Sequence, residues 1–323
     1  MNTVVMQPIK VSPRPVTRVV LRHRWPIRLM HWINALCLFV LLASGFQIFN
    51  AHPALYWGPD STFDHPALAM TSAPGADGKL HGTLSIGTHK FNTTGVLGAS
   101  RQDGNVVSRG FPSWATLPGA RNLALGRSWH FFFAWLLVIN GACFLLYAWL
   151  SHHASRDLAP TKRDWRGFGR SIIDHLRFKH PHGEEALRYN ILQKLAYVAV
   201  IYVMAPLIVL MGLSMSPHFD AAFGWLVNLV GGRQSARSIH FIIAVLFVGF
   251  IAIHLFEVLI SGVFNQLRSM ITGYFAVDFP ADTAPPQAAP VDSSRITSPL
   301  HPVSPPVLVA PAGVEPTTDG ERS

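Results

Sequence analysis

The chain has 323 residues, of which 50% are hydrophobic and only 13% are charged. This balance is typical of a polytopic membrane protein and argues against a soluble enzyme. The net charge of +9 does not indicate a nucleic-acid binder, because Lys and Arg flank apolar runs and no basic-aromatic surface motif accompanies them. Cys37 and Cys143 lie in different apolar runs and in no Cys-x-x-Cys-His sequence, so neither a disulfide framework nor covalently attached haem is implied.

Residues 1–28 form a basic N-terminal segment that contains Lys and Arg but no Asp or Glu. The segment has no apolar stretch that ends at a small-residue cleavage site, so no removable signal peptide is expected. It leads into a first apolar run, residues 29–49, with His31 near its start. By the positive-inside rule this end of the run lies in the cytoplasm.

Residues 50–127 form a long polar excursion rich in Gly, Pro, Ser and Thr. The orientation of the first run predicts that this loop lies in the periplasm, outside the inner membrane of a bacterial cell. The piece KFNTTGVLG, residues 90–98, is interpreted as a hairpin. The aromatic residues Trp57, Phe111 and Trp114 indicate a surface that packs on a partner, and an ordered cap that merely covers the bundle is the alternative.

Three further apolar runs complete a predicted all-α membrane protein, a four-helix transmembrane bundle with both termini in the cytoplasm. The cytoplasmic loop after the second run has the densest group of Lys and Arg and includes amphipathic pieces expected to lie on the membrane surface. The third run contains Pro206 and no histidine, and we expect it to supply packing only. The predicted segments are the runs 130–150, about 195–215 and 237–257, the cytoplasmic loop 151–194, a short outer loop 216–232, and a Pro-rich disordered tail 276–323.

The fourth run holds two histidines, His240 and His254, fourteen residues apart. Fourteen residues of α-helix turn through about 1400°, close to four full turns, and rise about 21 Å. Both imidazoles therefore face the same way, one near each membrane surface. An unpaired polar group in hydrocarbon costs several kcal/mol, so each needs a partner inside the bundle. Hydrogen bonds to neighbouring helices are the simpler explanation, and a functional site is the default one.

The predicted topology sorts the helix histidines into two level pairs, His31 with His254 inside and His130 with His240 outside. A pair of imidazoles facing across a bundle is what a non-covalent b-type haem needs, because iron takes one axial nitrogen from each side of the porphyrin. Two such pairs predict two stacked haems b. Haem propionates favour nearby cations, and arginines precede three of these histidines, although each is also a common interfacial anchor. These arginines are Arg28, Arg127 and Arg237.

Together these features resemble the di-haem cytochrome b subunits of Ni-Fe hydrogenases and formate dehydrogenases. The resemblance is carried by the Arg-rich N-terminus before His31-Trp32, the second-run histidine, the RYNILQK entry to the third run, and the histidine pair of the fourth. The loop pieces NAHPALYWG and GFPSWATLP and the entry GRSWHFFFAW are closer to the thiosulfate reductase cytochrome b subunit, a branch similar to bacterial cytochrome b561. The resemblance covers about residues 20–275.

By that resemblance each histidine pair ligates one haem, and a quinone binds near the cytoplasmic haem at the entry of the third helix. There, Asn190 and Gln193 match the family pattern. Their amides lie at membrane-entry depth and can hydrogen-bond a quinone carbonyl, with helix capping and interfacial anchoring as the alternative role.

The leading hypothesis is an inner-membrane subunit that carries electrons between the quinone pool and a periplasmic oxidoreductase. Resemblance to the thiosulfate reductase branch implies that this partner is a molybdopterin enzyme. One alternative is a self-contained quinone-linked oxidoreductase of a small reductant. Another is a histidine-dependent metal or proton transporter, which would have clustered ligands or carboxylates at mid-depth. The buried carboxylate of the apolar runs, Glu257, is predicted close to the inner surface.

Overall fold

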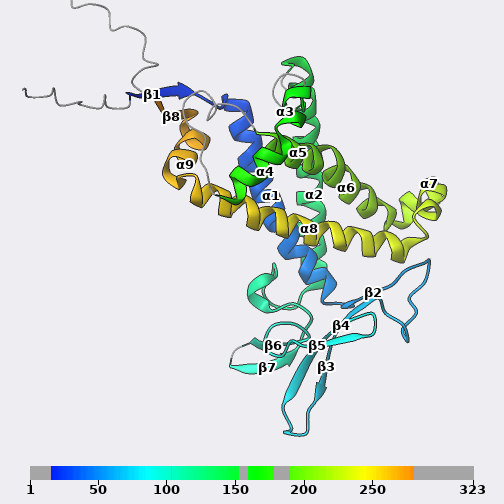
Figure 1. The fold of residues 1–323 in the computed structure, drawn as a ribbon. Coiled ribbons are helices and arrows are strands. Elements are labelled where there is room, and N and C mark those ends of the chain that lie inside the picture. Colours follow the sequence, from blue (N-terminus) through cyan, green and yellow to red (C-terminus); the bar gives the residue numbers. More distant parts are fainter. Residues whose placement is uncertain (1–15, 103, 153–158, 178–189, 280–323) are drawn as a thin grey trace, which may run out of the picture. The chain divides into compact units, whose positions relative to one another are not determined.

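The computed structural model describes residues 16–102, 104–152, 159–177 and 190–279. Four helices in this part of the chain are long and apolar enough to cross a membrane (Figure 1). Large apolar side chains on them, among them Phe39, Trp135 and Leu259, are exposed, as expected where lipid replaces water around a bundle. The four spans are Trp25–Phe49, Leu123–Leu150, Ile191–Ser214 and Arg233–Ile260.

Each span begins a few residues before the predicted apolar run, because its first helical turn includes polar residues that do not belong to an apolar run. In the second span the Asn122 side chain accepts a hydrogen bond from the Leu125 amide at 2.9 Å and caps the helix two turns before His130. The predicted loop 50–127 therefore ends at residue 122, and Arg127 lies inside the helix. The uninterrupted spans are α1 (Trp25–Phe49), α2 (Leu123–Leu150) and α8 (Arg233–Ile260).

The third span contains a π-helical stretch directly before Pro206. Proline lacks an N–H group, so it leaves the carbonyl of Tyr202, four residues earlier, without its helical donor. A wider helical turn at this point accommodates the missing bond. The span consists of α5 (Ile191–Val198), η4 (Ala199–Met204) and α6 (Ala205–Ser214).

The core of the bundle joins α6 to α8, with Met211 and Phe247 almost fully buried and Leu38 of α1 packed against them. α1 packs along α2, and a polar bridge links this pair within the membrane. The Asn140 side chain on α2 donates to the Met30 carbonyl at 2.9 Å and to the Asn34 side-chain oxygen at 2.7 Å. Such interhelical bonds satisfy polar groups that lipid leaves unpaired.

The all-α prediction is wrong for the long loop, which folds into two small β-sheets at the end of the bundle where α1 ends (Figure 1). Strands β2, β3, β4 and β5 form an antiparallel sheet in that order, and β6 pairs with β7. We call residues 50–122 the cap. Its elements are β2 (Ala54–Leu55), β3 (Leu68–Pro74), β4 (Leu80–Ile86), β5 (His89–Asn92), β6 (Ala99–Gln102), β7 (Asn105–Ser108) and the turn η1 (Ser113–Ala115).

The predicted hairpin at residues 90–98 is wrong. The first residues of that piece belong to β5, which pairs back with β4, for example Phe91 with Leu84. The chain then turns and begins β6 at Ala99. The hairpin formed by β3 and β4 turns through Gly75 and Gly78, where Gly78 has φ of 70°, a left-handed conformation that favours glycine.

A second departure from an all-α fold joins the two ends of the described chain. β1 (Val16–Leu21) pairs antiparallel with β8 (Tyr274–Phe279), and Arg18 and Arg22 lie over the rings of Phe279 and Phe275. The β-branched sequence VTRVVL favours a strand over a helix. Strand β8 thus includes residues 276–279, which were predicted to begin the tail, and residues 280–323 lie outside the described part.

Short helices lie between and after the spans. The predicted outer loop 216–232 is largely helical, and a helix with apolar residues on one face follows the fourth span. These helices are α3 (Lys162–Arg166), α4 (Phe168–Leu176), α7 (Pro217–Leu229) and α9 (Val263–Thr272).

Candidate functional site

The structure brings the four helix histidines together in two facing pairs. The rings of His130 and His240 have centroids 6.2 Å apart at 60°, and those of His31 and His254 have centroids 6.3 Å apart at 57°. Each pair joins α8 to a different helix, α2 for the first and α1 for the second. We call these the outer pair and the inner pair. Their separation along α8 is fourteen residues, or about 21 Å of helix rise.

The ring spacing in both pairs matches two imidazoles on opposite sides of one metal ion. A metal–imidazole bond is about 2 Å long, and the ring centre lies about 1.1 Å beyond the ligating nitrogen, so the two centroids should be about 6.3 Å apart. Direct contact or a hydrogen bond between the rings would bring them closer. A porphyrin iron requires only these two axial ligands from the protein, because the macrocycle supplies the other four nitrogens.

The third span holds His240 in place, although we expected it to supply only packing. His240 Nδ1 lies 2.8 Å from the Ile208 carbonyl oxygen of α6, and a carbonyl accepts only, so Nδ1 carries the hydrogen. Nε2 is then the nitrogen with a free lone pair. A Cβ atom at Gly212 would lie 3.3 Å from the His240 ring, so glycine makes room for the imidazole.

His130 has a matching arrangement on α1. The Ser44 hydroxyl donates to the Val40 carbonyl at 2.6 Å, and it lies 3.1 Å from His130 Nδ1. Because the hydroxyl hydrogen is committed to the carbonyl, the serine oxygen accepts from Nδ1–H, and again Nε2 is free to bind a metal. A Cβ atom at Gly45 would lie 3.4 Å from this ring. Both outer imidazoles are thus fixed in the tautomer that suits an axial ligand.

The inner pair lacks this support in the part of the chain that is described. His31 Nδ1 is buried without a hydrogen-bond partner there, and the same is true of Arg28 Nε, one helical turn away. The rings are held by aromatic contacts instead: Phe250 stacks on His254 at 5.9 Å, and Trp32 meets His31 edge-on at 5.3 Å. Buried polar atoms of this kind normally have a partner, so this end of the bundle has donors to offer a bound group.

The three arginines expected beside the haems differ in their surroundings. Arg28 donates to the Ile271 carbonyl at the end of α9. Arg237 donates to the His52 carbonyl at 2.6 Å and lies over the Phe49 ring. Arg127 is exposed on α2 and lies over the Phe131 ring. Arg28 and Arg237 therefore fasten the bundle to neighbouring segments whatever else they bind.

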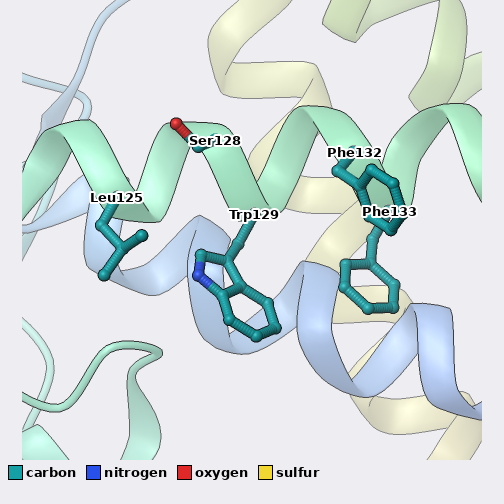
Figure 2. Close-up of a pocket in the computed structure, with 5 residues that line it drawn as sticks. All are labelled: Leu125, Ser128, Trp129, Phe132 and Phe133. Atoms are coloured by element: carbon teal, nitrogen blue, oxygen red, sulfur yellow. The ribbon is translucent and has the colours of Figure 1, made fainter.

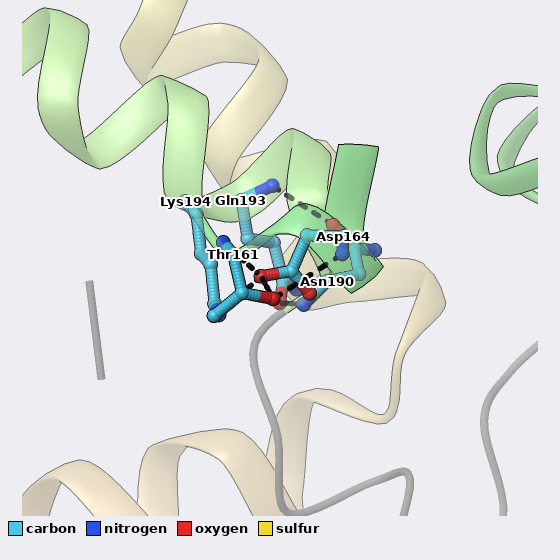
Figure 3. Close-up of polar contacts among 5 residues, drawn as sticks. All are labelled: Thr161, Asp164, Asn190, Gln193 and Lys194. Atoms are coloured by element: carbon cyan, nitrogen blue, oxygen red, sulfur yellow. Dashed lines mark hydrogen bonds and ion pairs between the residues drawn. The ribbon is translucent and has the colours of Figure 1, made fainter. Parts of the chain in front are cut away.

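Asn190 and Gln193, the predicted quinone-binding amides, form a capping box at the start of α5 (Figure 3). The Asn190 oxygen accepts from the Gln193 amide at 2.8 Å, and the Gln193 oxygen accepts from the Asn190 amide at 3.2 Å. The capping role considered for these residues is therefore present. Among the described residues neither side-chain NH₂ group has a partner, so these groups are the donors left for a ligand.

An ion pair beside this capping box was not predicted. Lys194 Nζ lies 2.9 Å from Asp164 Oδ2, with the two side chains 11% and 21% exposed (Figure 3). The same oxygen accepts from the amide and hydroxyl of Thr161, each at 2.8 Å, which caps α3. Burial alone would raise the pKa of Asp164, but the hydrogen bonds from Lys194 and Thr161 outweigh it and lower the pKa to about 2. The pair thus anchors helix α3 to the third span.

An apolar hollow of about 440 Å³ lies on α2, and its lining residues precede and follow His130 in the sequence (Figure 2). Trp129 and Phe133 stack in it with rings nearly parallel at 5.9 Å. Its one hydroxyl, on Ser128, donates to the Ala124 carbonyl, so the indole N–H of Trp129 is the hydrogen-bond donor left among the lining residues (Figure 2). Its chemistry suits acyl chains. The lining residues are Leu125, Ser128, Trp129, Phe132 and Phe133.

The cap is fastened to the outer end of α1 through buried polar groups. Arg109 is 2% exposed, and its guanidinium donates to the Phe111 carbonyl, the Gln47 side chain and the Thr116 hydroxyl. The Asn50 side chain bonds both backbone groups of Phe111. The Phe111 ring stacks on Phe46 at 4.2 Å, so it belongs to the interior rather than to a partner surface as expected. Trp57 and Trp114, by contrast, are exposed.

Comparison with known proteins agrees with this arrangement. Residues 22–273 match the model of the family described as prokaryotic cytochrome b561. The chain is 30% identical over 163 residues to the putative protein-methionine-sulfoxide reductase subunit YedZ1 of Azospira oryzae, covering 50% of this chain and 77% of that protein. It is 24% identical over 177 residues to the probable Ni/Fe-hydrogenase B-type cytochrome subunit of Cupriavidus necator, covering 50% of this chain and 72% of that one. The chain therefore belongs to the prokaryotic cytochrome b561 family and is a haem-binding membrane cytochrome of electron transport.

Proposed function

We propose that this protein is a di-haem b subunit of the bacterial inner membrane that carries electrons between the quinone pool and an oxidoreductase in the periplasm. The observation that carries the proposal is the spacing of the two histidine pairs, 6.2 and 6.3 Å between ring centroids, which fits one axially ligated iron in each. His130 and His240 would hold the outer haem, and His31 and His254 the inner one. The bound haems supply one-electron redox chemistry.

The protein positions these groups and adjusts their surroundings. Ser44 and the Ile208 carbonyl hold the outer imidazoles in the ligating tautomer, and the unpaired donors Arg28 Nε and His31 Nδ1 lie on the inner side. We propose that Arg28, Arg127 and Arg237 bind the haem propionates, because each arginine lies three residues before one of the proposed ligands. The four spans exclude water around both pairs.

Quinone would bind at the entry of the third span, beside the inner haem. The support is the RYNILQK sequence and the two amide NH₂ groups of Asn190 and Gln193, which remain as donors after the oxygens have capped α5. A quinone carbonyl accepts such hydrogens. The adjacent Lys194 is paired with Asp164, so we assign it to structure and not to the quinone.

The partner would contact the cap on the periplasmic side, where the outer pair lies closest to water. The similarity to subunits of redox enzymes supports such a partner. We infer that it is a molybdopterin enzyme from the resemblance of the cap sequences to the thiosulfate reductase branch. The basic segment 1–28 and the Pro-rich tail 276–323 would then both be cytoplasmic, on the opposite side from the cap.

Purification followed by a pyridine haemochrome assay tests the proposal. We expect b-type absorption bands and two haems per chain. Replacing His31 or His254 should remove one haem, and replacing His130 or His240 should remove the other, with different spectra for the two losses. One haem per chain, or the same spectral loss from His31→Ala and His130→Ala, would refute the pairing. A reporter fused after Ser323 should report a cytoplasmic C-terminus.

A further inference from the structure

One segment of the cap differs in charge from the rest of the cap. Residues 52–65, which we call the strap, contain Asp60 and Asp64 and no Lys or Arg, in a chain with a net charge of +9. The remainder of the cap, residues 67–122, is basic. It contains Lys79, Lys90, Arg101, Arg109 and Arg121 against Asp77 and Asp103.

The strap is bonded to the first turns of α8, which lead directly to His240. The Ser238 hydroxyl donates to the Tyr56 carbonyl at 2.6 Å, and Arg237 donates to the His52 carbonyl. Gly58 and Ser235 exchange two hydrogen bonds, one from each backbone amide, at 2.8 and 3.2 Å. The strap is therefore joined by hydrogen bonds to the helical turns that directly precede His240.

Close backbone contact keeps this junction in place. A Cβ atom at Gly232, which has φ of 102°, would lie 2.5 Å from Pro59 Cα, so the strap packs against the start of α8 without a side chain between them. Within the strap, the rings of His52 and Tyr56 stack at 5.6 Å, and Tyr56 is 2% exposed. The segment has an internal structure that fixes what it presents to the outside.

The strap presents large apolar side chains among carboxylates. Phe63 is 74% exposed and Trp57 is 56% exposed, although Phe63 has its ring edge against His52. Asp60 and Asp64 are also exposed. An apolar centre with charged neighbours is the composition of a protein interface. The two carboxylates disfavour an anionic lipid surface and favour a cationic partner.

We propose that the strap is the landing surface for a soluble redox domain whose rim around its cofactor carries Lys and Arg. The inference rests on the proposed function and specifies the surface chemistry of its partner. A bonded route from His240 towards solvent runs along α8 to Ser238 and through the Tyr56 carbonyl to the exposed Trp57. One electron passes at each encounter, so one centre is oxidised and the other reduced, with no bond or proton changed at the strap.

The electrostatic part is tested with the purified, reduced holoprotein and two soluble oxidants of opposite charge, a lysine-rich c-type cytochrome and ferricyanide. In the double variant Asp60→Asn/Asp64→Asn we expect the rate constant with the basic cytochrome to fall about three- to tenfold at low ionic strength. The difference should vanish at high salt, and the rate with ferricyanide should not fall. Asp77→Asn, a matched change on the β3–β4 turn, should behave as wild type.

The apolar part is tested by calorimetric binding of the same basic cytochrome to Trp57→Ala and to Trp114→Ala, which removes an even more exposed tryptophan elsewhere on the cap. Weaker binding in Trp57→Ala alone supports the strap as the landing surface. Unchanged rates and binding in all strap variants, with two haems per chain present, would overturn the inference. Quenching of Trp57 fluorescence by brominated lipid would also overturn it, because the strap would then face the membrane. Absence of haem would instead refute the proposed function.

Discussion

His240 donates its Nδ1 hydrogen to the Ile208 carbonyl of the third span, at 2.8 Å. The third span contains no histidine, yet its Ile208 carbonyl determines which nitrogen of His240 carries the hydrogen. The neighbouring Gly212 leaves room for the ring, with 3.3 Å between a Cβ atom at that position and His240 Cε1. The position of the His240 ring therefore depends on a backbone carbonyl and on the space beside a glycine, and a histidine motif in the sequence shows neither.

Replacing Gly212 by valine should displace the His240 ring, because its added methyl groups would extend beyond a Cβ position already in close contact. We expect the outer haem to be lost or its occupancy to fall at least twofold, measured as the haem-to-protein ratio. Gly249→Val is the matched control, since a Cβ atom at Gly249 meets nothing within 4 Å. Equal haem content in the two variants would contradict the prediction.

Ser44→Ala should raise the reduction potential of the outer haem alone. The serine oxygen accepts from His130 Nδ1–H, and this bond increases the basicity of the ligating nitrogen, which favours ferric iron. A loss of about 1 kcal/mol corresponds to a shift of about 40 mV for one electron. Potentiometric titration followed optically measures it. Ser214→Ala removes a buried hydroxyl that bonds Leu210 instead and should leave both potentials unchanged.

Arg109→Ala should loosen the cap from α1. The guanidinium is buried and its acceptors are all neutral, so truncation removes the donor to the Gln47 side chain and to the Thr116 hydroxyl, while the Phe111 carbonyl keeps its hydrogen bond from Asn50. We expect a cost of about 3 kcal/mol, seen as faster proteolysis of the cap and a lower midpoint of thermal unfolding. Arg109→Lys should also be destabilising, because one ammonium does not reproduce the fork of donors. The exposed Arg101→Ala should change little.

The Asp164–Lys194 pair should make stability depend on pH at the acid end. The pKa of Asp164 in the folded protein is about 2, below its ordinary value of 3.8, so the carboxylate stabilises the fold above pH 4. This contribution, about 1 to 2 kcal/mol, is lost as the pH falls from 4 towards 2. Thermal unfolding followed by tryptophan fluorescence should show Asp164→Asn less stable than wild type at pH 7. A difference that persists undiminished at pH 2.5 would exclude this origin.

The sequence predicts which span histidines face each other, because helix geometry and charge asymmetry together give their depth. Fourteen residues between His240 and His254 place both on one face of α8, and charge asymmetry assigns His31 and His130 to opposite ends. The backbone carbonyl of Ile208 has no sequence signature, and Ser44 and Gly45 resemble any small residues in an apolar run. Their roles depend on which helices become neighbours, and this information is not local.

The cap was predicted as a loop because its strands are short and its hydrophobic alternation is weak. The pairing of β3 with β4 across Gly75 and Gly78 follows ordinary turn chemistry, but Arg109 is buried and Phe111 half-buried only because the cap folds back onto α1. Exposure of an aromatic residue in such a segment is set by tertiary contacts. For that reason Trp57 is exposed whereas Phe111 packs against α1, although both lie in similar loop sequence.

The ladder between Val16–Leu21 and Tyr274–Phe279 has a consequence for topology that does not depend on any charge rule. One strand precedes the first span and the other follows the fourth, and backbone groups that share hydrogen bonds lie on the same side of a bilayer. A chain whose two arms meet in this way must have crossed the membrane an even number of times. If one crossing were lost or gained, the two strands would lie on opposite sides of the bilayer and could not pair. The β1–β8 ladder therefore forms only when the chain has inserted with an even number of crossings.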